Sequence, residues 1–155
     1  MRRTVPVILL ALLVISLSRG GPVQGQNVQK ITITMREFRY TPARVTLQAG
    51  VPAEITLINR GKVAHEFMVY AMPRQMGSAS MGHEWVEKNN YFQGLPATVE
   101  GGKVTRKGGH LLEIVVGPGQ TATLKFTPTR KGTFEFGCMI TGHYEAGHKG
   151  MLIVK

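Results

Sequence analysis

The sequence of 155 residues contains a single cysteine and no aspartate, because all nine acidic residues are glutamate. One cysteine excludes an internal disulfide framework, a four-cysteine zinc site and any centre held by two thiolates. Long apolar runs are also missing: the longest, residues 5–17, is too short to cross a bilayer comfortably. Any chemistry of Cys138 is therefore the chemistry of a lone thiolate.

Charge is unbalanced, with 19 basic residues against nine acidic ones and a formal net charge of +10. Hydrophobic residues make up 43% and charged residues 18%, a composition that supports a packed core in roughly one domain. It excludes a disordered chain, a collagen-like repeat and a polytopic membrane protein. The basic residues are scattered, with no basic helix, so we expect no nucleic-acid partner. We expect instead a solvated positive surface that steers an acidic protein partner.

The first 25 residues have the pattern of a signal peptide. A basic start at residues 1–3 is followed by the apolar run, and residues 23–25 offer small side chains where a signal peptidase reads them. We predict export to the periplasm or the medium, with cleavage near Gly25–Gln26; an uncleaved anchor is the alternative. Cleavage removes three of the 19 basic residues and no acids, which leaves 16 against nine and a net charge of +7.

The mature chain, residues 26–155, is dominated by short runs in which apolar and polar residues alternate. Such runs, bounded by Gly and Pro, are typical of β-strands. They cover residues 28–35, 44–48, 53–58, 66–70, 111–116, 121–126, 133–136 and 151–154. About eight such strands predict an all-β protein, an antiparallel sandwich or Greek-key barrel.

One stretch departs from this rhythm. Residues 71–110 lack clear alternation, and only residues 82–90 have the pattern of a short helix. A connection of this length in a compact domain is usually functional or a subdomain. We therefore expect an insertion of roughly forty residues on the sandwich.

Metal-binding residues are concentrated near the C-terminus. Cys138 ends an alternating run, and His143 and His148 follow, each separated from the preceding one by four residues. Gly142 and Gly147 precede the two histidines and allow the sharp turns that point the imidazoles inward. His65 opens an earlier strand. One thiolate and two imidazoles, from one loop and one distant strand, are the ligand set of a trigonal copper site.

These motifs resemble those of the cupredoxins, the small blue-copper family that includes plastocyanin, azurin and auracyanin. The loop from Cys138 to Met151 is similar to the family's Cys…Gly-His…Ala-Gly-Met-Lys-Gly pattern, and Asn59 and His65 match its upstream Asn…His pair. The resemblance covers nearly the whole mature chain, apart from the insertion. It implies a Greek-key β-sandwich that holds one copper through His65, Cys138 and His143.

The resemblance is broken at the fourth ligand. The family's weak axial methionine is replaced by His148 in this sequence. Met151, three residues further on, is the alternative axial ligand, although the start of the closing strand favours a core position for it. Glu66 is next to His65, but neighbouring side chains of a strand point to opposite faces, which favours a surface or supporting role.

Two other chemistries use the same residues. Zinc accepts Cys and His ligands in a tetrahedron, and a third strong imidazole makes it a serious rival to copper. A cysteine nucleophile with a histidine base is also conceivable, but no orienting group or oxyanion hole can be identified.

A second group of possible ligands lies at the start of the insertion. Met72, Met76, Met81 and His83 follow one another on an irregular segment, and thioethers are soft ligands for Cu(I). We therefore consider a second Cu(I) site there. Met68 lies within a strand, where a core position is expected.

Two functions are consistent with one copper site. The first is electron transport between redox partners, the usual role in the family, with the edge of His143 as the exit. The second is copper delivery, storage or tolerance, which the methionine cluster and the substituted axial ligand favour. We predict an electron carrier that is not an enzyme, because four protein ligands leave the metal no open position. We expect a monomer; whether it is free or membrane-associated stays open.

Overall fold

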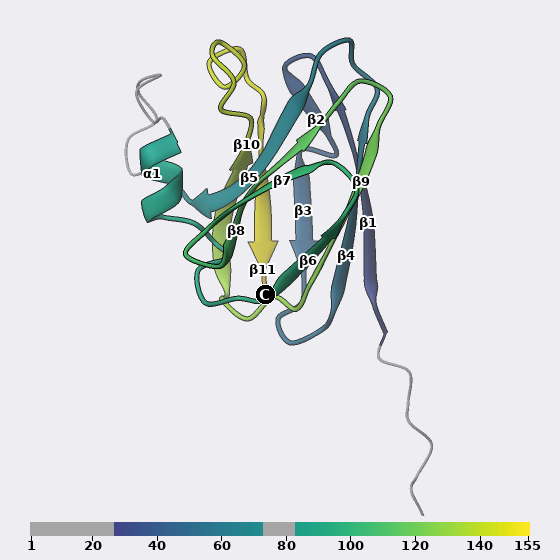
Figure 1. Cartoon of the computed structure of the whole chain (residues 1–155). Coiled ribbons are helices and arrows are strands. Elements are labelled where there is room, and N and C mark those ends of the chain that lie inside the picture. Colours follow the sequence, from purple (N-terminus) through teal and green to yellow (C-terminus); the bar gives the residue numbers. More distant parts are fainter. Residues whose placement is uncertain (1–26, 73–82) are drawn as a thin grey trace, which may run out of the picture.

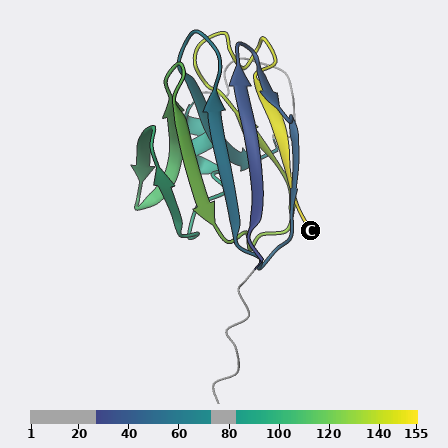
Figure 2. The same cartoon turned by 90° about the vertical axis from the view of Figure 1, so that its right-hand side faces the viewer.

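The computed structural model describes residues 27–72 and 83–155, which form two packed β-sheets with one short helix (Figures 1 and 2). The strands are β1 (Gln29–Arg36), β2 (Arg39–Thr41), β3 (Arg44–Leu47), β4 (Ala53–Asn59), β5 (His65–Ala71), β6 (Ala97–Glu100), β7 (Lys103–Lys107), β8 (His110–Val116), β9 (Thr121–Phe126), β10 (Gly132–Gly137) and β11 (Lys149–Val154), and the helix is α1 (His83–Lys88). The prediction of a cupredoxin-like β-sandwich is confirmed.

The strand order is β2-β1-β4-β9-β6 in the five-stranded sheet and β3-β11-β10-β5-β8-β7 in the six-stranded sheet. Most neighbours are antiparallel, as expected. Two pairs, β1 with β4 and β3 with β11, are parallel, a detail that alternation of residue types does not encode. The chain leaves the first sheet after β2 and enters the second at β3, so the N-terminal strands contribute to both sheets.

The alternation in the sequence reflects burial of one face of each sheet. In β4 every second residue is buried, and the same pattern closes the chain in β11. Their apolar side chains meet between the sheets in a single core, which includes Ile33, Leu57, Phe67, Leu124 and Phe136. Burial of this apolar surface stabilises the sandwich by about 25 cal/mol per Å².

The stretch 71–110 contains more regular structure than the sequence indicates. The predicted helix over residues 82–90 is observed as α1, but β6 and β7 were missed. Both are edge strands of the two sheets: β7 is charge-rich, and β6 is only four residues long. Edge strands carry charge to avoid pairing with other chains, and in β7 this removes the alternation by which strands are recognised. β6 alternates, but over a run too short to be recognised. Much of the expected insertion is therefore continuous with the sandwich.

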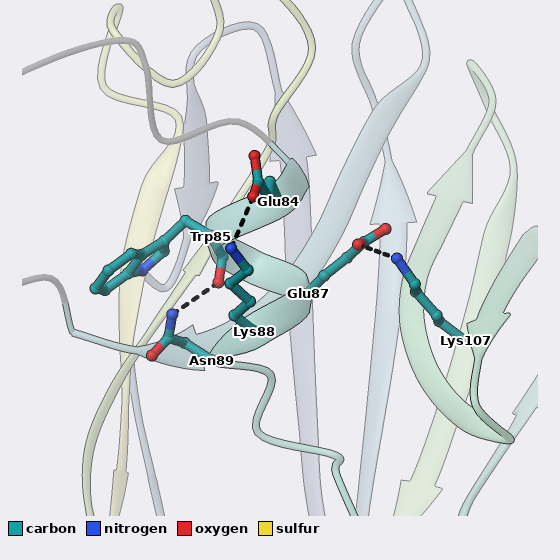
Figure 3. Close-up of polar contacts among 6 residues, drawn as sticks. All are labelled: Glu84, Trp85, Glu87, Lys88, Asn89 and Lys107. Carbon is teal, nitrogen blue, oxygen red and sulfur yellow. Dashed lines mark hydrogen bonds and ion pairs between the residues drawn. The ribbon is translucent and has the colours of Figure 1, made fainter.

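Helix α1 packs on the outer face of the six-stranded sheet (Figure 1). Its Val86 joins a second, smaller apolar cluster with Met68 and Tyr70 of β5, Leu112 and Tyr144. One ion pair, between Glu87 and Lys107 of β7, joins the helix to the sheet (Figure 3). The other two contacts are local: Glu84 pairs with Lys88 at 2.7 Å, and Asn89 Nδ2 donates to the Trp85 carbonyl at 2.9 Å. Because β5 is covered on both faces, it is buried along nearly its whole length.

The predicted signal peptide, residues 1–25, lies outside the described residues. Within residues 27–72 and 83–155, no helix has the length and apolar character needed to cross a membrane.

Candidate metal centre

The four predicted ligands of the metal come together at one end of the sandwich. One donor atom each from His65, Cys138, His143 and His148 lies within 4.8 Å of all the others. His65 is the first residue of β5, Cys138 follows the last residue of β10, and the two other histidines lie in the loop between β10 and β11. This loop is at the end opposite the C-terminus (Figure 1).

The pairing of strands explains this convergence. β10 is antiparallel to β5, with Gly137 opposite Met68, so the end of β10 lies beside the beginning of β5. On its other side β10 pairs with β11, and the ladder continues past the strand end because the Cys138 amide donates to the His148 carbonyl at 3.1 Å. Ligands that are far apart in sequence are thus placed by three adjacent strands.

The ligand loop folds back on itself through its own backbone hydrogen bonds. The His143 amide donates to the Ile140 carbonyl at 2.9 Å, and the His148 amide donates to the His143 carbonyl at 3.0 Å. Gly142 and Gly147 have φ of +82° and +99°, which side chains with a Cβ rarely adopt. The sharp turns expected before both histidines are present.

Asn59 fixes the loop that leads to His65. Its side chain is fully buried and donates to the carbonyls of Val63 and Val116 at 2.8 and 2.7 Å, while its oxygen accepts from the Gly61 amide at 2.8 Å. This loop is therefore held at both ends. Asn59 therefore positions His65 through the loop between them and not through a direct contact.

Burial divides the four side chains into three inner ones and one outer one. His65, Cys138 and His148 are fully buried, whereas His143 is partly exposed. Cys138 Sγ lies 3.4 Å from His143 Nδ1 and accepts a hydrogen bond from the Glu66 amide at 3.4 Å. His143 is thus the one member of the group that solvent or a partner can reach.

Burial also sets the protonation states of the inner groups. It raises the pKa of the Cys138 thiol to about 11 and lowers the pKa of His148 to about 3, with His65 and His143 adding to the second effect. The pKa of His65 is lowered for the same reason. The two buried imidazoles are therefore neutral at physiological pH and keep a lone pair for a metal. A thiol with a raised pKa is the opposite of an activated nucleophile.

The two buried imidazoles have no hydrogen-bond partners. In the described part of the chain, neither Nδ1 nor Nε2 of His65 or His148 finds a donor or an acceptor. A buried polar atom left unpaired costs about 1–3 kcal/mol. Unpaired nitrogens facing a lone thiol fit a metal that accepts N and S donors, and among first-row divalent ions copper binds such donors most strongly.

The alternative ligands lie elsewhere. Met151 alternates in β11 with the core residues Leu152 and Val154, so its side chain is on the other face of the strand. Glu66 is buried and accepts a hydrogen bond from the Met139 amide at 2.9 Å. Its burial and the neighbouring Glu113 raise its pKa to about 7. It supports the chain next to Cys138, in line with the expected supporting role.

The possible second site is largely outside the described residues. Met76 and Met81 fall in the segment 73–82, and the side chain of His83 is also outside the described part; Met72 is half-buried at the end of β5. Met68 is fully buried, as expected, but in the smaller cluster under α1. The second Cu(I) site stays a prediction.

Two aromatic neighbours of the imidazoles were not predicted from the sequence. Phe38 meets His143 edge-on with ring centroids 5.5 Å apart, and Tyr40 lies against His148 at 4.2 Å. Both residues come from the β1–β2 hairpin, in which β2 has only three residues. A strand this short leaves no alternation to recognise; the only signal was the aromatic pair itself.

Comparisons with known proteins agree with this fold. The model of the cupredoxin-like domain matches residues 6–79, which include His65 but not the ligand loop. Copper-resistant cuproprotein CopI of Pseudomonas aeruginosa is 27% identical, over 88% of this chain and 82% of its own length. The protein of the same name from Rubrivivax gelatinosus is 23% identical, over 88% of this chain and 73% of its own length.

Among solved structures, auracyanin of Roseiflexus castenholzii superposes with a TM-score of 0.58 at 21% identity, covering 82% of this chain and 97% of its own. The strands, the sheet order and the convergence of His65, Cys138 and His143 agree with the resemblance seen in the sequence. The chain has a cupredoxin-like fold, and the model of the cupredoxin-like domain matches its residues 6–79.

Proposed function

We propose that this protein is an exported copper-binding protein that holds one copper ion through Cys138 and the three histidines His65, His143 and His148. The observation that carries the proposal is the pair of buried imidazoles without hydrogen-bond partners, each with one nitrogen within 4.8 Å of the buried Cys138 thiol. The unpaired imidazole nitrogens destabilise the metal-free protein, and a metal ion that binds to them removes this cost.

The bound ion supplies a one-electron Cu(I)/Cu(II) couple. The residues around it do the rest: Cys138 gives up its proton on binding, because only the thiolate is a metal ligand. The two buried imidazoles, already neutral, bind without losing a proton. Four protein donors leave no open coordination position, which supports a protein that binds or passes on copper without turning over a substrate.

We propose copper tolerance as the physiological role. Both CopI relatives carry copper resistance in their names and align over most of this chain. Three of the four donor residues are fully buried, which favours retention of the ion over rapid exchange. A basic surface in the exported compartment, with a net charge of +7 after cleavage, would then select acidic protein partners for copper transfer.

Electron transport is the second candidate, and one observation favours it. His143 is partly exposed while the other three donors are buried, so its ring edge gives an electron partner a route to the metal. The same edge could serve copper transfer, so exposure alone does not choose between the roles.

Binding is tested by titrating the purified mature protein with Cu(II) and recording absorption and electron paramagnetic resonance spectra. We expect one equivalent to bind, with an intense thiolate-to-copper band that disappears on reduction. Cys138→Ser should remove the band, whereas a control change at exposed Val28, which precedes β1, should leave it intact. A colourless protein that retains zinc would contradict the proposal.

The role is tested by deleting the gene in the source organism and measuring growth on copper together with respiratory or photosynthetic electron flow. For tolerance, the deletion strain should be copper-sensitive, with growth restored by the wild-type gene but not by the Cys138→Ser variant. Normal growth on copper with reduced electron flow would instead support electron transport.

A further inference from the structure

Three residues of the β1–β2 hairpin, Glu37, Phe38 and Tyr40, lie near the three imidazoles of the metal centre. Phe38 contacts His143, with the ring planes at 88° and centroids 5.5 Å apart. Tyr40 lies against His148 at 4.2 Å and donates a hydrogen bond from its hydroxyl to the Glu66 carbonyl. The hairpin belongs to the sheet opposite the ligand strands, so these contacts are made across the sandwich.

Glu37 makes the third connection, to the loop before His65. Its carboxylate accepts a hydrogen bond from the Lys62 amide. A Cβ added at Gly61 would lie 2.7 Å from Glu37 Oε1 and 2.8 Å from His65 Nε2, so carboxylate, glycine and imidazole are packed closely. A different side chain of the turn thus lies near each histidine: Glu37 near His65, Phe38 near His143 and Tyr40 near His148.

The backbone of this turn is strained at Phe38. Its φ is +63°, and among the described residues it is the one non-glycine with positive φ. The second central residue of such a two-residue turn is normally Gly or Asn, because an aromatic residue with a Cβ resists this conformation. Phe38 as a whole is also 47% exposed, so burial in the core does not compensate for the strain. Strain of this kind, next to a site, points to a role for the side chain there.

From these contacts we infer that the Glu37–Tyr40 turn is a clamp that fixes the three imidazoles in ligand positions, and that Phe38 slows release of the metal by holding His143. The inference rests on the proposed copper site. His143 is the exposed donor, so dissociation begins where its ring swings outward. The edge of Phe38 opposes that movement. Phe38 is thus a positioning residue that acts through His143.

The test replaces Phe38 with glycine, which removes the ring and relieves the backbone. The copper-loaded mature protein is mixed with excess of a small chelator, and loss of the thiolate-to-copper band gives the release rate. We expect release to be roughly 2- to 12-fold faster, the range that corresponds to losing one aromatic pair. Phe38→Tyr keeps the ring and should release at the wild-type rate. Val28→Gly, an equally exposed apolar residue beyond the far end of β1, is the matched control.

Two further measurements separate a clamp from a general effect on folding. The thermal midpoint of copper-free Phe38→Gly should equal or exceed that of the wild type, because glycine accepts a positive φ. Nitrogen-15 spectra of the histidine rings in the copper-free protein should show one narrow His143 signal in the wild type and a broadened one in the variant.

Unchanged release from Phe38→Gly would overturn the inference. Faster release with a lowered midpoint would also overturn it, since destabilisation alone would then explain the rate. The ring spectra need no metal, so they test the clamp even if the wild-type protein fails to bind copper; equal His143 line widths in both proteins would refute it.

Discussion

A buried glutamate beside the ligand loop offers a direct test of how the loop is held. Glu135 of β10 is 3% exposed, and its Oε1 accepts hydrogen bonds from Tyr70 at 2.8 Å and from Tyr144 at 2.7 Å. Tyr70 belongs to β5, and Tyr144 follows His143 in the loop between β10 and β11. One carboxylate oxygen therefore connects the loop to two strands that bear ligands.

The magnitude follows from the charge of the acceptor. A hydrogen bond to a charged group contributes about 1.5–3 kcal/mol, so Tyr144→Phe and Tyr70→Phe should each lower the free energy of unfolding by that amount. In the double variant the buried carboxylate loses both partners. The free energy of unfolding of the double variant should therefore fall by more than the sum of the two single decreases. The excess should be about 1–3 kcal/mol, the penalty for an unsatisfied buried group.

Urea unfolding of the copper-free protein measures these differences, with a constant slope as the check that the unfolded state is unchanged. Tyr91→Phe is the matched control: Tyr91 is fully buried, but its hydroxyl has no hydrogen-bond partner among the described residues. Its removal should not destabilise the protein and should raise the free energy of unfolding by up to about 1–3 kcal/mol, because an unpaired buried hydroxyl is removed. The reasoning fails if Tyr70→Phe and Tyr144→Phe cost no more than this control, or if their effects are additive.

Three other predictions concern pH, the fourth ligand and charge. Burial and Glu135 raise the pKa of Tyr70 and Tyr144, so above pH 10 the unfolded state binds fewer protons than the folded state. The free energy of unfolding should therefore fall as pH rises, and it should fall less steeply in Tyr144→Phe. Nitrogen donors favour Cu(II), so His148→Met should raise the reduction potential and shift the colour towards blue; an unchanged spectrum and potential would exclude His148 as a ligand. Association with an acidic partner should slow as ionic strength rises, because screening acts over about 10 Å at 0.1 M; a salt-independent rate would remove the steering proposal.

The ligand loop could be predicted because its information is local. Cys138 ends a strand that alternates, and two Gly-His pairs follow at equal spacing. His65 is different: nothing local distinguishes it from a surface histidine. The resemblance to the cupredoxins placed it, and the antiparallel pairing of β5 with β10 explains why it lies beside Cys138.

The missed features have a common physical cause. β7 is a charge-rich edge strand without alternation, and β6, the other edge strand that was missed, alternates over only four residues. The contacts of Phe38 and Tyr40 with the imidazoles join segments about a hundred positions apart in sequence. Periodicity carries no information about such contacts, since they depend on how the two sheets stack.

The stacking of the sheets also explains how unpaired nitrogens are maintained at the centre of the site. His65 and His148 could lower their energy in the copper-free protein by turning towards water, but Tyr40 covers one ring and the Asn59 loop fixes the approach to the other. Apolar burial between the sheets far exceeds the cost of about 1–3 kcal/mol per unpaired group, so the fold keeps both rings in place. The donors are then preorganised, and binding a metal need not order them. His143 is the partly exposed donor and lies against Phe38, so we expect exchange of the metal on the side of the site that Phe38 covers.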